Sequence, residues 1–213
     1  AQATIHGRAQ IQDVELAADE NGKLTGMRVR LIGDMGAYLQ LVTPGIPLLG
    51  AFLYAGVYEM PHAFDFSCTS VFTNMTPTDA YRGAGRPEAT YAIEHAMDAL
   101  ARTMCIDPLE MRRRNIIPTE KYPYESNTGL VYDSGEPDKA ATVAEELLDY
   151  AGLRARQAEQ NTPDAKQRLG IGVSSYFEMC GRAPSRVLAS LTYSAGGWES
   201  ATVRVLPTSK VQL

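Results

Sequence analysis

The sequence has no long apolar run. Its best candidate for a membrane span, residues 46–57, is short and contains two glycines, whereas a membrane-spanning helix needs about 20 apolar residues. Basic residues are outnumbered, because 20 Lys and Arg face 25 Asp and Glu and give a net charge of -5. Without a basic stripe the chain lacks the usual footprint of a nucleic-acid-binding protein. We expect neither a membrane span nor a nucleic-acid partner.

Cysteine is also scarce. Cys68, Cys105 and Cys180 are odd in number and far apart, and they lack the short spacings of metal ligands. The three histidines have no ligand spacing either. This pattern favours neither a disulfide framework nor a zinc site. We therefore expect a protein of the reducing cytoplasm.

The composition is otherwise that of an ordinary globular protein, with 45% hydrophobic and 21% charged residues. A chain of 213 residues can form one large domain or parts of two. It begins without Met, and its last residues continue an alternating apolar pattern that is typical of an unfinished strand. We interpret the sequence as an internal piece of a longer protein.

The local patterns predict both strands and helices. Residues 12–18 and 24–32 alternate around Asn21-Gly22, which predicts a β-hairpin covered on one face. Further strands are expected at 64–73, 171–175, 187–193 and 200–206, and a loop with a short helix at 33–61. Helices are expected from Pro87 to about 104, from Asp107 to about 115 and over 138–150, followed by a polar, exposed stretch at 154–168. The fold class is therefore α+β, with mixed, mostly antiparallel sheets and flanking helices.

Three consecutive arginines, Arg112 to Arg114, lie at the end of the second predicted helix. Cations are favoured near the negative pole of a helix dipole. We expect a solvated helix end here, not a binding patch.

The segment Ala80–Arg86, with the sequence AYRGAGR, has the strongest chemical pattern. A strand, a glycine-bearing turn and a helix start in succession bring backbone N–H groups to one point, which suits an anion. Arg82 at the strand end could grip a phosphate or an oxo group, and Arg86 could add a second charge. Alternatively, the glycines only permit a tight turn and the arginines pair with surface carboxylates.

The sequence TDAYRGAGRPEA at Thr78–Ala89, with IEH at 93–95 and DPLEMRRRN at 107–115, resembles the large, molybdenum-bearing subunit of the molybdenum hydroxylases. This family includes xanthine oxidase, aldehyde oxidase and carbon monoxide dehydrogenase, and the resemblance extends over nearly the whole chain. It implies a part of an elongated molybdopterin-binding subunit. Residues 1–166 would belong to the first molybdopterin-binding domain, and residues 167–213 would begin the second.

The resemblance also implies roles for the turn. Arg82, Gly83 and Tyr81 would contact the cofactor, and Ala84 and Gly85 would border the substrate pocket. No residue of the chain would bind the metal directly, and the general-base glutamate would lie outside these residues. The piece alone would be inactive.

Departures from relatives narrow the expected chemistry. Carbon monoxide dehydrogenases of this family place a copper-binding cysteine at Gly83, and purine oxidisers place an aromatic ring at Ala84 and an arginine at Leu49. This chain resembles the second form of carbon monoxide dehydrogenase-like enzymes. We expect an enzyme that oxidises an aldehyde or heteroaromatic carbon, with water as the oxygen source.

The cofactor implied is molybdenum–molybdopterin cytosine dinucleotide. Iron–sulfur and FAD partner subunits would complete a dimer of heterotrimers acting on a small molecule. The alternatives are a non-catalytic subunit-assembly module, a genuine carbon monoxide dehydrogenase despite Gly83, or a nucleotide-phosphate binder, although the βαβ context and third glycine of that motif are missing. Glu178 and Cys180 could belong to a second active-site loop or be ordinary residues.

Overall fold

The computed structural model describes residues 4–60, 63–179 and 200–212. The chain divides into two compact units, residues 1–177 and 178–213. The expected domain boundary at residue 166 stays a prediction. No helix within the described ranges is long and apolar enough to cross a membrane.

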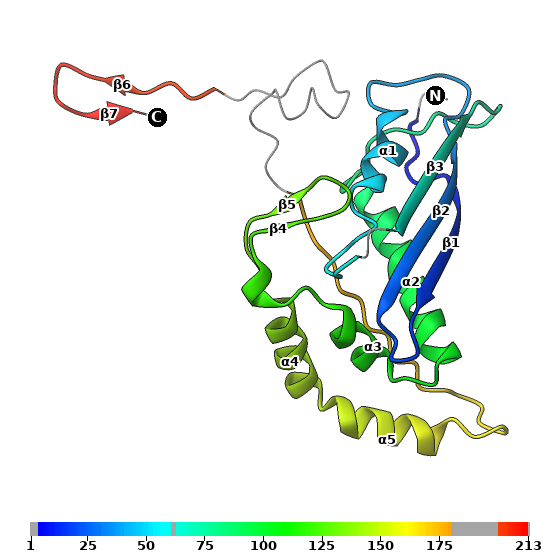
Figure 1. The fold of residues 1–213 in the computed structure, drawn as a ribbon. Coiled ribbons are helices and arrows are strands. Elements are labelled where there is room, and N and C mark those ends of the chain that lie inside the picture. Colours follow the sequence, from blue (N-terminus) through cyan, green and yellow to red (C-terminus); the bar gives the residue numbers. More distant parts are fainter. Residues whose placement is uncertain (1–3, 61–62, 180–199, 213) are drawn as a thin grey trace. The chain divides into compact units, whose positions relative to one another are not determined.

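The first unit is built on a three-stranded sheet with the order β1-β2-β3 (Figure 1). Strands β1 (Gln10–Ala18) and β2 (Leu24–Asp34) form the predicted antiparallel hairpin, and Gly22 at its turn has φ 81°. Strand β3 (Ala63–Val71) pairs with β2 in parallel. A parallel neighbour needs a long crossover. The connection between β2 and β3 is long enough and includes the short helix α1 (Gly45–Ala51).

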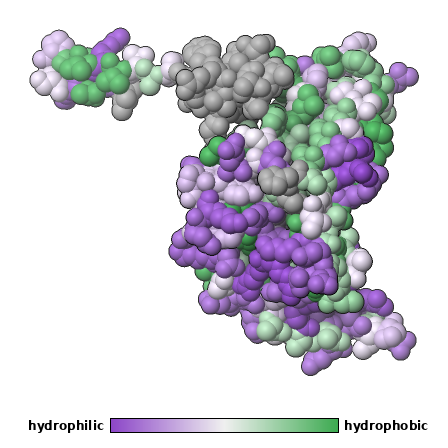
Figure 2. Space-filling model, viewed as in Figure 1, coloured by the Kyte–Doolittle hydropathy of each residue, from purple (hydrophilic) through white to green (hydrophobic). Residues whose placement is uncertain are grey.

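One face of the sheet is covered by α2 (Arg86–Thr103), as Figure 1 shows. The side chains of Met27, Val29 and Leu31 are buried on that face, as the alternation predicts. Arg28 and Arg30 point to the open face and contact Asp65. These charges form a hydrophilic patch over β2 and β3 (Figure 2). The alternation therefore correctly separates the covered face from the open one.

Three further α-helices and three short elements follow α2. These are α3 (Pro108–Asn115), η1 (Thr119–Lys121), β4 (Tyr124–Glu125), β5 (Val131–Tyr132), α4 (Pro137–Leu148) and α5 (Tyr150–Gln160). The carboxylate of Asp107 accepts the N–H groups of Leu109 and Glu110 and so caps α3, which confirms the predicted start of this helix. The first part of the stretch expected to be polar and exposed, residues 154–160, belongs to the helix α5, which contains no buried residue.

The strand expected at 171–175 is wrong, because residues 169–179 form no strand among the described residues. The Ser175 N–H donates to the Glu94 carboxylate over 2.9 Å instead, and the Phe177 ring stacks on Tyr132 at 3.9 Å. Contacts with Glu94 and Tyr132, elsewhere in the first unit, thus replace a sheet partner. Residues 187–193 lie outside the described ranges. In the second unit, β6 (Arg204–Val205) pairs with β7 (Val211–Gln212), so the strand expected at 200–206 is formed in part.

The expectation of a solvated arginine run is wrong for its first member. The Arg112 side chain is 0% exposed, and it donates to Glu94 and Asp98 over 2.8 Å each. Arg112 is buried because α3 packs on α2 and this side chain faces the interface. Arg113 and Arg114 stay half-buried. The buried Tyr58 hydroxyl donates to the same Glu94 carboxylate, and burial raises the pKa of Tyr58 well above its usual range.

Candidate functional site

The turn Tyr81–Gly85 leads directly into α2. The sequence predicts a strand directly before this turn, but β3 ends at Val71 and the residues between β3 and the turn form a loop. The arginine expected at a strand end, Arg82, therefore lies in the turn itself.

Hydrogen bonds join the loop before the turn to other segments of the first unit. The Thr43 hydroxyl donates to the carbonyl of Thr78 over 2.6 Å, and the Thr78 hydroxyl donates to the carbonyl of Asp34 over 2.7 Å. The Asp79 N–H donates to the carbonyl of His6 over 2.9 Å. Thr43 and Thr78 are buried. The turn thus starts from a fixed point beside the end of β2.

Three consecutive residues of the turn have positive φ angles, 99° at Gly83, 39° at Ala84 and 93° at Gly85. This conformation costs an L-residue about 1–2 kcal/mol. Glycine avoids that cost at two of the three positions, and Ala84 bears it. Such outliers gather at ligand sites, and here the outlier falls within the motif that the sequence singled out.

The two glycines are also required by their neighbours. A Cβ added at Gly83 would lie 2.6 Å from the ring of Pro87, and one at Gly85 would lie 2.3 Å from the carbonyl oxygen of Ile46 in α1. The space beside both Cα atoms is therefore already filled. A substrate pocket bordered by Ala84 and Gly85 stays a prediction. The missing side chains of Gly83 and Gly85 do not leave empty space for a substrate, because Pro87 and Ile46 occupy it.

Backbone N–H groups that could form an anion cradle are partly used within the turn. The Ala84 N–H donates to the carbonyl of Tyr81 over 2.8 Å, and the Arg86 N–H donates to that of Gly83 over 3.2 Å. The Gly85 N–H donates to the Glu88 carboxylate over 3.1 Å. This contact caps α2. Three of the N–H groups that could form the expected cradle, those of Ala84, Gly85 and Arg86, therefore already have an acceptor within the turn or the start of α2.

Arg82 is the side chain of the turn best placed for an anion. It is exposed, and its guanidinium has no hydrogen bond or ion pair among the described residues. Its five N–H donors are therefore open to an oxygen-rich group. Tyr81 beside it is 61% exposed. This donor set fits an anionic cofactor, and the alternative in which Arg82 pairs with a surface carboxylate is not observed in the described residues.

Arg8 is a contact of the turn that the sequence analysis missed. Its guanidinium donates to the carbonyl of Arg82 over 2.6 Å and lies 4.8 Å from the centre of the Tyr81 ring. Its Nε is 3.9 Å from the Glu88 carboxylate. No short motif joins residues so far apart in sequence, so only the fold brings them together.

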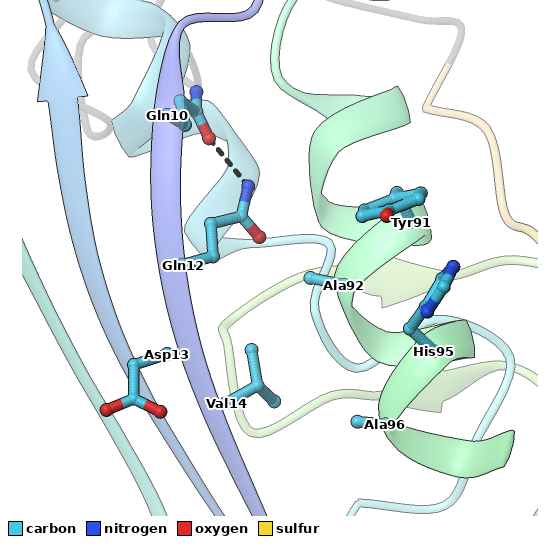
Figure 3. A pocket seen from close by; sticks show the side chains of 8 residues that line it. All are labelled: Gln10, Gln12, Asp13, Val14, Tyr91, Ala92, His95 and Ala96. Atoms are coloured by element: carbon cyan, nitrogen blue, oxygen red, sulfur yellow. Dashed lines mark hydrogen bonds between the residues drawn. The ribbon is translucent and has the colours of Figure 1, made fainter. Parts of the chain in front are cut away.

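A groove of about 410 Å³ lies between β1 and α2 (Figure 3). Gln12 donates to Gln10 on its strand side, and the rings of Tyr91 and His95 lie 4.3 Å apart on its helix side. Asp13 is on the opposite side of β1 from His95, so the two do not form an acid–base pair (Figure 3). None of residues 81–85 lines this groove.

Among the residues that the structure describes, no three His, Cys, Asp or Glu side chains gather where they could hold a metal ion. Cys68 is half-buried, Cys105 is exposed, and both are free. Glu178 is described, but Cys180, its partner in the suggested second loop, is outside the described ranges. The turn Tyr81–Gly85 therefore remains the candidate site.

Residues 1–116 match the family model of the molybdopterin cofactor-binding domain. The carbon monoxide dehydrogenase large chain of Hydrogenophaga pseudoflava is 35% identical over 96% of this chain and 26% of its own length. For the nicotine 6-hydroxylase large subunit of Paenarthrobacter nicotinovorans, the identity is 33%, over 88% of this chain and 23% of the relative. The chain thus spans about a quarter of the length of the curated relatives it matches.

The fold is also similar to a solved structure. Quinoline 2-oxidoreductase from Pseudomonas putida 86 matches with a TM-score of 0.87 and 33% identity, over 98% of this chain and 26% of that one. This similarity agrees with the expected fold class of helices flanking mixed, mostly antiparallel sheets.

Proposed function

The chain belongs to the molybdopterin cofactor-binding family, and we propose that it forms part of the catalytic subunit of a molybdenum-dependent hydroxylase. The proposed reaction is oxidation of an aldehyde or heteroaromatic carbon, with water as the oxygen source. The observation that carries the proposal is the exposed Arg82 guanidinium in a strained, firmly anchored turn.

Arg82 and Tyr81 would hold the cofactor from the turn. A planar guanidinium suits the oxygen atoms of a phosphate or oxo group through paired N–H donors. When bound, molybdenum–molybdopterin supplies the two-electron oxidation. The chain's own contribution is to bind and orient, because Arg82 is presented by a turn that α1, α2 and Arg8 all contact.

The names of two relatives favour a heteroaromatic substrate, and the packing at Gly83 disfavours carbon monoxide. Nicotine 6-hydroxylase and quinoline 2-oxidoreductase, whose names give heteroaromatic substrates, are both similar to this chain at 33% identity. At Gly83 the ring of Pro87 occupies the space in which a copper-binding cysteine side chain would begin. We infer that carbon monoxide is not the substrate, although a carbon monoxide dehydrogenase large chain is 35% identical over 96% of this chain.

We further propose the cytosine dinucleotide form of the cofactor, with iron–sulfur and FAD subunits in a dimer of heterotrimers located in the cytoplasm. The names of relatives as large chains and subunits support a multi-subunit enzyme. The competing function is a non-catalytic assembly module.

Metal analysis separates these functions. The full-length protein, purified with its natural partners, should contain stoichiometric molybdenum and release a cytosine nucleotide on hydrolysis. Dye-linked assays with quinoline, nicotine, several aldehydes and carbon monoxide should give turnover with a ring or an aldehyde. Absence of molybdenum would favour the assembly module. Rapid carbon monoxide turnover would overturn the inference, drawn from Gly83, that carbon monoxide is not the substrate.

Arg82 itself is tested by substitution. Arg82→Ala should lower molybdenum content or turnover, since it removes the donors of the turn. Arg102→Ala is the matched control, because Arg102 is an exposed arginine at the far end of α2. Equal metal content and rate in the two variants would contradict the role of Arg82.

A further inference from the structure

We propose that Arg8 is a positioning residue for the molybdopterin-binding turn, an inference that rests on the function proposed above. Its side chain contacts the Tyr81 ring and the Arg82 carbonyl of the turn and lies near the Glu88 carboxylate in the first turn of α2. These points span the start of the turn and the cap of α2. Arg8 thereby fixes the backbone that presents the Arg82 side chain.

The backbone around Arg8 is itself fitted to the turn. His6 lies on one side, where its N–H donates to the carbonyl of Pro77 over 3.0 Å. A Cβ at Gly7 would lie 2.8 Å from the Cβ of Tyr81, so only glycine allows this approach. Arg8 has φ 64°, a left-handed conformation that is uncommon for residues other than glycine. Strained backbone of this kind gathers at active sites and ligand-binding segments, and here it lies where the backbone at Gly7 closely approaches Tyr81.

The charge of Arg8 has a second effect. The Glu88 carboxylate is only 7% exposed and accepts the Gly85 N–H over 3.1 Å, so its negative charge lies beside the turn and would repel an anionic ligand of Arg82. The Arg8 guanidinium offsets this negative charge from 3.9 Å. Arg8 is itself 39% exposed, so solvent screens part of the effect. The proposed role therefore combines geometry with local charge balance.

Lysine could not replace Arg8 fully. A guanidinium is planar, so it can face an aromatic ring while its N–H groups reach a carbonyl and a carboxylate. An ammonium group is a compact point charge and keeps only the charge balance with Glu88. Arg8→Lys should therefore retain part of the function, and Arg8→Met should lose it.

The test uses the full-length enzyme with its natural partners. Molybdenum content, turnover per bound molybdenum, thermal midpoint and hydrogen exchange of residues 80–86 are measured for the wild type, Arg8→Lys, Arg8→Met and the control Arg102→Met. We expect Arg8→Met to lower turnover per bound molybdenum by roughly 10- to 100-fold, the range typical of residues that orient a ligand. Arg8→Lys should be intermediate, and exchange in the turn should accelerate in both.

The measurements separate positioning from stability alone. A purely structural residue would lower the thermal midpoint and the amount of loaded enzyme but leave turnover per molybdenum unchanged, and that result would overturn the proposal. Unchanged exchange of residues 80–86 would overturn it as well. If Arg8→Met does not fold, Arg8→Lys decides the question, because it keeps the positive charge but loses the planar set of N–H donors. Absence of molybdenum from the wild type would refute the proposed function itself and is recognised before any variant is compared.

Discussion

The Arg112 guanidinium donates to the Glu94 carboxylate over 2.8 Å, and this ion pair joins α3 to α2 inside the first unit. The same carboxylate accepts the Tyr58 hydroxyl and the Ser175 N–H. One buried acidic group thus connects four separate parts of the chain.

Replacement of Arg112 should be among the most destabilising single changes. Arg112→Met leaves Glu94 buried without its cation, which should lower the free energy of unfolding by about 3–5 kcal/mol. Arg114→Met is the matched control, because Arg114 pairs with Glu110 at a partly exposed helix position and should cost about 0–1 kcal/mol. Chemical denaturation of both variants measures the difference, and equal losses would show that the buried pair is not a major source of stability.

Stability should fall at alkaline pH because of Tyr58. Burial raises its folded-state pKa well above the ordinary value, which the unfolded chain retains. Its contribution is therefore fully present below pH of about 10 and is lost as the pH rises through the folded pKa. Unfolding free energies from pH 8 upward should fall less steeply in Tyr58→Phe than in the wild type. Parallel curves for the two proteins would assign the alkaline loss to other groups.

Gly83→Ala should destabilise the protein by more than backbone strain alone. Gly129 provides the control, because it has a similar φ of 84° but open space around its Cβ position. Gly129→Ala should cost about 1–2 kcal/mol, and Gly83→Ala should cost about 1–3 kcal/mol more, because the new methyl group overlaps Pro87. Similar losses in thermal denaturation would mean that Pro87 gives way without cost.

Removal of the Phe177 ring should loosen the segment 169–177. Its stack on Tyr132 should contribute about 0.5–1.5 kcal/mol beyond its buried area. Phe177→Ala should accelerate hydrogen exchange around Ser175. Tyr176→Ala is the neighbouring aromatic control, since Tyr176 is 71% exposed and should change exchange little. The proposal that the stack holds this segment fails if both variants exchange alike.

Local patterns predicted the hairpin and the helix starts, because Asn21-Gly22 and the Asp107 cap act through neighbours in sequence. The turn Tyr81–Gly85 was identified for the same reason. The burial of Arg112 could not be predicted from the sequence, because three adjacent arginines are typical of a solvated helix end and the buried partner, Glu94, lies on another helix. Arg8 was missed because its partners are distant in sequence and nothing local marks it.

The close approach of Pro87 to Gly83 also bears on how such loops diverge. If Gly83 alone were replaced by cysteine, the new Cβ would overlap the Pro87 ring, and the sulfur could not bind a metal without a shift of the turn. The two positions are therefore epistatic, and the order of changes matters. A route from this loop to a thiolate-bearing one would first have to relax position 87 or alter the turn that brings it close.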